Sequence, residues 1–144
     1  MKRRRFLQTG AGATASTFTI LKAGSARTYA ANEKLNIASI GAGGRAAADI
    51  SALSPTENIV ALADVDWARA APKFRAHADA KRFKDYRKML EEMDSEIDAV
   101  VVATPDHHHF HASMAAIKRG KPVYCEKPLT HSVWEARELT RAAR

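Results

Sequence analysis

A glycine-rich turn is the first candidate for chemistry in this sequence. Gly41-Ala42-Gly43-Gly44-Arg45-Ala46 matches the pattern G-x-G-x-x-G/A. In that pattern the first glycine permits a tight turn, the second lets the backbone approach a pyrophosphate, and the small last residue lets a helix pack on a sheet. The N–H groups and the dipole at the start of the following helix favour an anion. The turn predicts a phosphate-binding site that includes Gly41, Gly43, Gly44 and Arg45.

An acidic residue follows at the spacing that a dinucleotide requires. Asp64 comes 23 residues after Gly41, at the end of the apolar run 59–63. A carboxylate at the end of a second strand can accept both hydroxyl groups of the adenosine ribose, and it would repel a 2′-phosphate. The sequence therefore predicts NAD in preference to NADP. Arg45 could reach a 2′-phosphate, which keeps NADP as the alternative. Asp66 directly precedes the next helix and is the better candidate for its N-cap.

Two later segments combine polar side chains with the ends of apolar runs. Thr104 and Pro105 follow the run 97–103, and Cys125-Glu126-Lys127-Pro128 follows a shorter run. In open parallel sheets, ligands bind beyond the carboxyl ends of the strands. Lys127 could stabilise negative charge on a substrate oxygen or assist proton movement there. The alternative for Lys127 is an ordinary solvated loop lysine.

The histidines and the cysteine are weaker candidates. His107 and His111 are four residues apart and could share a helix face, but no convincing third ligand lies near them, so no metal site is predicted. Cys125 is the only cysteine, which excludes an internal disulfide. A buried thiol at a strand end, without an assigned base, is expected to be inert.

These candidates need a fold that brings strand ends together. Alternating apolar runs and helical stretches predict strands at 35–40, 58–63, 82–86, 97–103 and 122–125. Helices are predicted at 43–53, 67–78, 87–93, 107–119 and from 132 onward, with Pro72 disturbing the second of them. Strands alternating with helices predict an α/β fold with a doubly wound parallel sheet, the Rossmann arrangement. We expect one dinucleotide-binding domain at 35–144, although its sheet has five strands where the full arrangement has six.

The charge of the chain is concentrated in its first thirty residues. Six of the 23 basic residues and none of the 16 acids lie there, which leaves 17 bases against 16 acids in the rest of the chain. A nearly neutral body gives no reason to expect a nucleic-acid partner. No apolar run approaches the ~20 residues that a stable membrane anchor needs.

The segment 1–30 has the composition of an export signal. Lys2 to Arg5 is followed by a mildly apolar stretch and by small residues around Ala26 and Ala30, either of which could precede a cleavage site. Arg3-Arg4-x-Phe6-Leu7 resembles the twin-arginine motif, whose pathway carries folded proteins to the periplasm. A disordered basic tail is the alternative. The G-x-G-x-x-A pattern at 10–15 precedes no predicted βαβ unit and is rejected as a cofactor site.

The spacing of several short motifs resembles that of the Gfo/Idh/MocA oxidoreductase family. T-P-x-x-x-H at 104–109, Gly120-Lys121 and E-K-P at 126–128 match without gaps from Asp98 to Pro128, and loosely back to Leu35. The resemblance implies that Thr104 and Pro105 line the cofactor. It implies that His109 approaches the nicotinamide-side ribose, and that Glu126-Lys127-Pro128 places Lys127, as the catalytic residue, near nicotinamide and substrate.

The same resemblance implies a protein that oxidises a sugar- or polyol-like CH–OH group with NAD(P). The family's C-terminal α+β substrate domain, with an Asp/His pair, is expected to be absent from these 144 residues. We therefore expect the chain to bind a dinucleotide without turning over substrate, and to be poorly soluble. A homo-oligomer is possible for a full-length protein. The alternatives are an NAD-dependent glycosidase of the same superfamily, a non-catalytic dinucleotide-binding module, and a methyltransferase, against which the E-K-P segment argues.

Overall fold

The computed structural model describes residues 34–144. The predicted export signal and the rejected glycine pattern at 10–15 lie outside this part of the chain. The strands are β1 (Asn36–Ile40), β2 (Asn58–Ala63), β3 (Lys81–Phe83), β4 (Ala99–Val102) and β5 (Val123–Cys125). The helices are α1 (Arg45–Leu53), α2 (Trp67–Ala76), α3 (Tyr86–Glu92), α4 (Asp106–Ile117) and α5 (Val133–Ala142).

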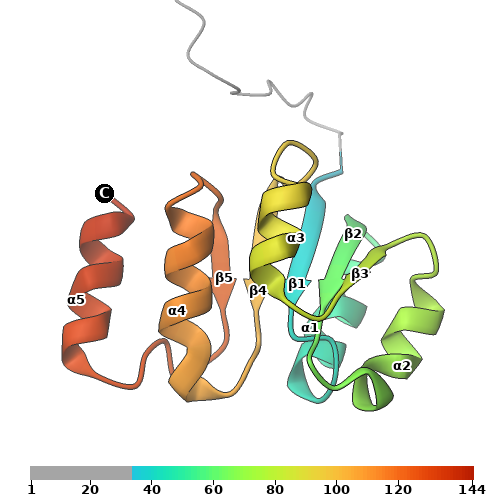
Figure 1. Ribbon diagram of the computed structural model, residues 1–144, viewed down its shortest axis with the longest axis horizontal. Helices are drawn as coiled ribbons and strands as arrows, with labels where there is room; N and C mark the ends of the chain where they lie inside the picture. Colours follow the sequence, from blue (N-terminus) through green and yellow to red (C-terminus); the bar gives the residue numbers. More distant parts are fainter. Residues whose placement is uncertain (1–33) are drawn as a thin grey trace, which may run out of the picture. The chain divides into compact units, whose positions relative to one another are not determined.

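The five strands form one sheet in the order β3-β2-β1-β4-β5, and every pair in it is parallel (Figure 1). This confirms the predicted α/β fold with a doubly wound parallel sheet. Strands β2 and β3 are added on one side of β1, and β4 and β5 on its other side, so the order of strand addition reverses between β1 and β4. Ligands of such folds bind beyond the carboxyl ends of the strands at this reversal.

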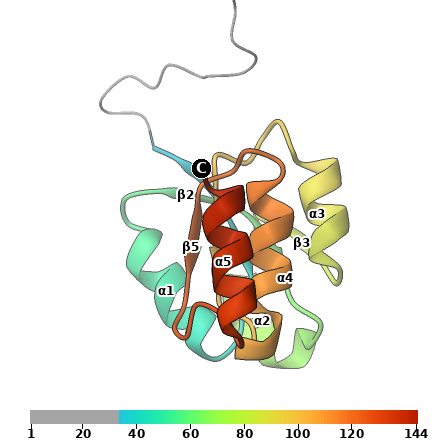
Figure 2. The same cartoon turned by 90° about the vertical axis from the view of Figure 1, so that its left-hand side faces the viewer.

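Each face of the sheet is covered by its own helices. On one face, Ala38 and Ile40 of β1 pack with Met89 and Leu90 of α3 and with two alanines of α4. On the other face, Leu62 of β2 packs with residues of α1 and α2. Side chains alternate between the two faces of a strand, so strands covered on both faces are apolar almost throughout. Figure 2 shows α5 beside α4, at the β5 end of the sheet.

The structure corrects one predicted boundary near the ligand-binding edge. The predicted strand 82–86 is the shorter β3, and Tyr86 is the first residue of α3 instead of a strand residue. The cause is Asp85, whose side chain accepts a hydrogen bond from the Arg87 N–H and caps α3. Asp66 caps α2 in the same way, as predicted, by accepting from the Arg69 N–H. Helix α2 continues through Pro72. In residues 34–144, no helix is both long and apolar enough to cross a membrane.

Candidate functional site

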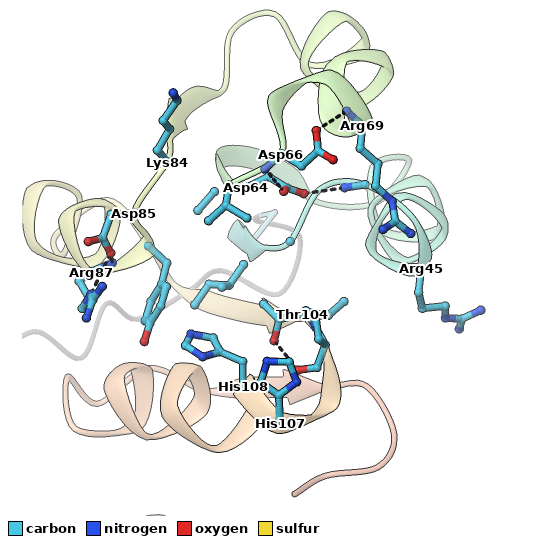
Figure 3. A pocket seen from close by; sticks show the side chains of 18 residues that line it. Arg45, Asp64, Asp66, Arg69, Lys84, Asp85, Arg87, Thr104, His107 and His108 are labelled. Atoms are coloured by element: carbon cyan, nitrogen blue, oxygen red, sulfur yellow. Dashed lines mark hydrogen bonds and ion pairs between the residues drawn. The ribbon is translucent and has the colours of Figure 1, made fainter. Parts of the chain in front are cut away.

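A cavity of about 730 Å³ opens at the carboxyl ends of β1, β2 and β4 and is bounded on its outer side by the start of α3 (Figure 3). Six of the residues predicted from sequence line it: Gly41, Gly43, Arg45, Asp64, Thr104 and Pro105. Its size lies within the range of small-molecule and cofactor sites. Four predicted residues do not line this cavity: Gly44, His109, Glu126 and Lys127.

Gly41 occupies the tightest place in the glycine turn. Its φ is +98°, and a Cβ atom added to it would lie 2.7 Å from the carbonyl oxygen of Ala103. The Gly41 N–H donates to the carbonyl of Ala63 at 2.8 Å, so the turn is held between the ends of β2 and β4. A residue with a side chain fits neither this backbone conformation nor this space.

Asp64 lies at the end of β2, as predicted, and connects two turns. Its Oδ2 accepts hydrogen bonds from the N–H groups of Ala42 at 2.8 Å and Gly43 at 3.0 Å. Its Oδ1 accepts from the Asp66 N–H at 2.9 Å. A carboxylate has about four acceptor positions. Three of them are filled by the backbone, so the carboxylate is fixed in place and keeps capacity for a further donor such as a ribose hydroxyl.

Arg69 is a pocket residue that the sequence analysis did not identify. Its side chain lies along the glycine turn, where Cβ atoms added to Gly43 and Gly44 would meet it at 2.8 and 2.5 Å. Arg69 stands in the first turn of α2, five residues after Asp64. That position next to a predicted strand end was a usable signal. The guanidinium brings positive charge to the region where a phosphate group is predicted to bind.

Arg45 is directed away from the middle of the cavity in Figure 3. Its Nη2 lies 3.1 Å from Glu126 Oε1 and 3.3 Å from Asp49 Oδ1. The hydrogen bond from Arg45 lowers the pKa of Glu126, whereas burial and the charge of Glu126 raise the pKa of Asp49. Arg45 therefore connects α1 to the segment after β5. It is engaged with carboxylates where the sequence analysis considered a 2′-phosphate.

His109, which is predicted to approach the nicotinamide-side ribose, is a residue of α4 that does not line the cavity. The ring is buried, with 2% of its surface exposed. Its Nδ1 lies 2.7 Å from the carbonyl oxygen of Pro128, and its Nε2 lies 2.7 Å from that of Thr104. Both ring nitrogens are thus taken by the backbone, which leaves none for a ribose hydroxyl.

Lys127 is exposed, and the Lys127–Pro128 peptide bond is cis. No ion pair in residues 34–144 involves its ammonium group. The role predicted for Lys127 stays a prediction at this stage.

The other histidines of α4 and Cys125 are the weaker candidates from the sequence. His108 lines the cavity, where burial lowers the pKa of its ring, and it lies 5.5 Å from His111 in a stacked pair. Within the described residues, no three His, Cys, Asp or Glu side chains are grouped to hold a metal ion. Burial raises the pKa of the Cys125 thiol, which lowers its fraction of reactive thiolate.

The residues present fit a dinucleotide. Gly41 and Gly43 of the glycine turn line the cavity, and a fixed carboxylate stands at the end of the neighbouring strand. Two acids in the cavity, Asp66 and Asp85, are occupied as helix caps, while Arg69 and Lys84 add positive charge around it. This balance suits a ligand that carries phosphate groups and ribose hydroxyls.

Comparison with known proteins also indicates a dinucleotide-binding domain. A family model for oxidoreductases with an NAD-binding Rossmann fold, GFO_IDH_MocA, matches residues 35–144. D-xylose 1-dehydrogenase (NADP(+)) from Hypocrea jecorina is 37% identical over 90 residues, which are 60% of this chain and 22% of that protein. Inositol 2-dehydrogenase from an Arthrobacter species is 34% identical over 113 residues, which are 76% of this chain and 33% of that protein. The chain thus spans about a fifth to a third of the length of these relatives.

Solved structures agree in fold. An NAD-binding oxidoreductase from Klebsiella pneumoniae has a TM-score of 0.61 and 36% identity, over 78% of this chain and 32% of that one. A 3-ketoreductase from Actinomadura kijaniata, in complex with TDP-benzene and NADP, has a TM-score of 0.68 and 29% identity, over 78% and 36%. Because the family model covers most of the chain, and the glycine turn and Asp64 lie where a dinucleotide site requires them, the chain belongs to the Gfo/Idh/MocA oxidoreductase family through its NAD-binding Rossmann domain.

Proposed function

We propose that this chain is the cofactor-binding part of an oxidoreductase that moves a hydride between a sugar- or polyol-like CH–OH group and NAD. The observation that carries the proposal is the carboxylate of Asp64, held at the end of β2 by three backbone N–H groups beside the glycine turn. The relatives that are inositol and xylose dehydrogenases support the substrate class.

Each residue has a definite task in this proposal. The first N–H groups of α1 and the Arg69 guanidinium bind the pyrophosphate, and Asp64 accepts from the adenosine ribose. Thr104 and Pro105 line the cavity beyond the end of β4. A bound nicotinamide ring supplies the hydride acceptor. Lys127, at the end of β5, stabilises negative charge on the substrate oxygen or assists its loss of a proton. The rest of the substrate site would come from residues beyond this chain.

The anionic charge of Asp64 favours NAD over NADP, because a 2′-phosphate placed beside it would meet a like charge in a partly buried position. Arg69 is the opposing influence. The similar D-xylose 1-dehydrogenase is an NADP(+) enzyme, and the similar 3-ketoreductase was solved in complex with NADP. An NAD-dependent glycosidase remains the alternative activity, since the same cofactor site could serve it. A non-catalytic dinucleotide-binding module is the other alternative.

Titration of the 144-residue chain with NAD⁺, NADP⁺ and S-adenosylmethionine, followed by isothermal calorimetry, tests the proposal. We expect saturable binding of NAD⁺, with weaker binding of NADP⁺ and none of S-adenosylmethionine. Preference for S-adenosylmethionine would indicate a methyltransferase and would overturn the proposal, as would failure to bind any dinucleotide.

We also propose that residues 1–30 direct export to the periplasm through the twin-arginine pathway. The support is the sequence Arg3-Arg4-x-Phe6-Leu7, followed by a mildly apolar stretch and small residues. Expression in a bacterium with an intact pathway, cell fractionation and mass spectrometry of the N-terminus provide the test. We expect periplasmic chain that begins after Ala26 or Ala30. Cytoplasmic chain with an intact N-terminus would contradict the proposal.

A further inference from the structure

The segment Glu126-Lys127-Pro128 follows β5, the last strand at one end of the sheet that residues 34–144 form. Strand β5 pairs with β4 alone in the described sheet, so one side of this segment has no neighbouring strand to hold it. Edge positions of this kind are free to move unless other contacts fix them. The structure provides such contacts on both sides of Lys127, and they come from two different helices.

The contact on the Pro128 side is made by His109 of α4. One ring nitrogen lies 2.7 Å from the Pro128 carbonyl oxygen and the other lies 2.7 Å from the Thr104 carbonyl oxygen. We call this arrangement the His109 bridge. Carbonyl oxygens only accept hydrogen bonds. Both contacts are therefore hydrogen bonds when the ring carries hydrogen on both nitrogens. The bridge joins the loop after β4, which lines the cavity, to the loop after β5.

The contact on the Glu126 side is made by Arg45 of α1. The Glu126 carboxylate lies 3.1 Å from the Arg45 guanidinium and accepts a hydrogen bond from the Tyr124 hydroxyl at 3.2 Å. The Glu126 N–H donates to the carbonyl of Val102 at 2.9 Å. Glu126 is 8% exposed, so this ion pair is largely shielded from water on one side. Both neighbours of Lys127 are thus held.

The burial of an imidazole ring such as that of His109 needs a physical explanation. Burial of its polar atoms costs free energy that only well-formed hydrogen bonds recover, and an apolar side chain of similar size would pack without that cost. The two acceptors are also informative. One belongs to a residue of the cavity wall, and the other directly follows Lys127. The bridge therefore relates the position of Lys127 to the wall of the cofactor cavity.

We propose that His109 is a positioning residue for Lys127: its two ring nitrogens face the carbonyl oxygens of Thr104 and Pro128, its N–H donates to this pair, and the contact fixes the Glu126–Pro128 segment against the edge of the cofactor cavity. The bridge consists of contacts within the chain, whereas its consequence for the nicotinamide end of the ligand rests on the proposed function. Arg45 and Glu126 hold the other side of the same segment.

The bridge can be tested without any cofactor, on the 144-residue chain. The variants are His109→Phe, which cannot donate, and His109→Gln, which can donate through its amide. His111→Gln is the matched control, because it makes the same change on the same helix at an exposed ring that contacts neither carbonyl. We expect amide hydrogen exchange at residues 126–131 to rise about tenfold in His109→Phe, as a loosened local structure requires. The exchange rate at these residues should rise less in His109→Gln, and in His111→Gln it should equal that of the wild type.

Nitrogen-15 NMR of the wild-type imidazole near neutral pH gives a direct signature. A His109 N–H that is hydrogen-bonded to a carbonyl and protected from exchange with water supports the bridge, and a ring whose N–H exchanges freely with water overturns it. A rise in exchange spread equally over β1, β4 and residues 126–131 also overturns the proposal, since it would show a general loss of stability instead of a local release.

A second measurement tests the consequence for the cofactor. NAD⁺ and ADP-ribose share the adenosine and pyrophosphate parts, but only NAD⁺ has the nicotinamide that Lys127 would approach. We expect His109→Phe to weaken NAD⁺ about tenfold while ADP-ribose binding changes little, which corresponds to about 1.4 kcal/mol. Equal weakening of both ligands would contradict a positioning role. If the wild type binds neither ligand, the proposed function fails, and the exchange and NMR results alone decide the bridge.

Discussion

Gly41→Ala is expected to destabilise the folded chain by about 2–5 kcal/mol, the sum of a positive-φ cost and an overpacking cost. The backbone of Gly41 has φ +98°, a region that residues with a Cβ rarely adopt. The new methyl group would also lie 2.7 Å from the Ala103 carbonyl oxygen. That oxygen belongs to the backbone just after β4. The Ala103 N–H donates a hydrogen bond to the Ile40 carbonyl oxygen, so the Ala103 backbone has little freedom to move away. Urea unfolding followed by circular dichroism measures the loss.

Gly120→Ala is the matched control for this prediction. Gly120 also has a positive φ, +71°, but a Cβ atom added there meets nothing within 4 Å. Gly120→Ala should therefore lower the free energy of unfolding only by the cost of the positive φ, about 1–2 kcal/mol. The difference between the two variants isolates the contact with Ala103. Equal destabilisation would show that the glycine turn has room for a methyl group, and would remove the steric argument for glycine at this position of the tight turn.

The apolar pattern of the sequence predicts the sheet well, because burial on both faces leaves little choice of residue. The run 97–103 is the clearest case, and its centre is β4. Asp64 was likewise predictable, because its place depends on chain spacing after Gly41 and on the end of a strand. These are properties that a linear pattern carries directly.

Side-chain partners were harder to predict, because they depend on how separate loops meet. Arg45 is followed closely by Asp49 on one helix turn, but its contact with Glu126 joins segments far apart in the chain. The family resemblance implies that His109 is a site residue, but a linear motif does not reveal that its ring faces two carbonyl groups. Tyr86 was assigned to a strand because the capping role of Asp85 went unrecognised.

Asp64→Asn is expected to change the choice between NAD⁺ and NADP⁺. The substitution removes the negative charge and one acceptor oxygen from a group that now binds three backbone N–H groups. We expect NAD⁺ affinity to fall by a factor of about 10–100, which is about 1.4–2.7 kcal/mol. NADP⁺ affinity should fall much less, because the repulsion between Asp64 and a 2′-phosphate is lost at the same time. Calorimetric titration of both cofactors, with the variant and the wild type, measures this. Asp79→Asn removes the same charge from an exposed site outside the cavity and should leave both affinities unchanged.

The ratio of the two affinities is more informative than either value. A looser glycine turn in Asp64→Asn would weaken NAD⁺ and NADP⁺ alike, because they share the pyrophosphate that the turn binds. Only the charge and the ribose contact of Asp64 distinguish the two cofactors. A shift of the ratio toward NADP⁺ by about tenfold or more would therefore assign cofactor choice to Asp64. An unchanged ratio, or a wild type that already prefers NADP⁺, would mean that the nearby positive charge of Arg69 outweighs the carboxylate. In that case Arg69→Ala should lower NADP⁺ affinity more than NAD⁺ affinity, since a guanidinium gains most from the additional phosphate.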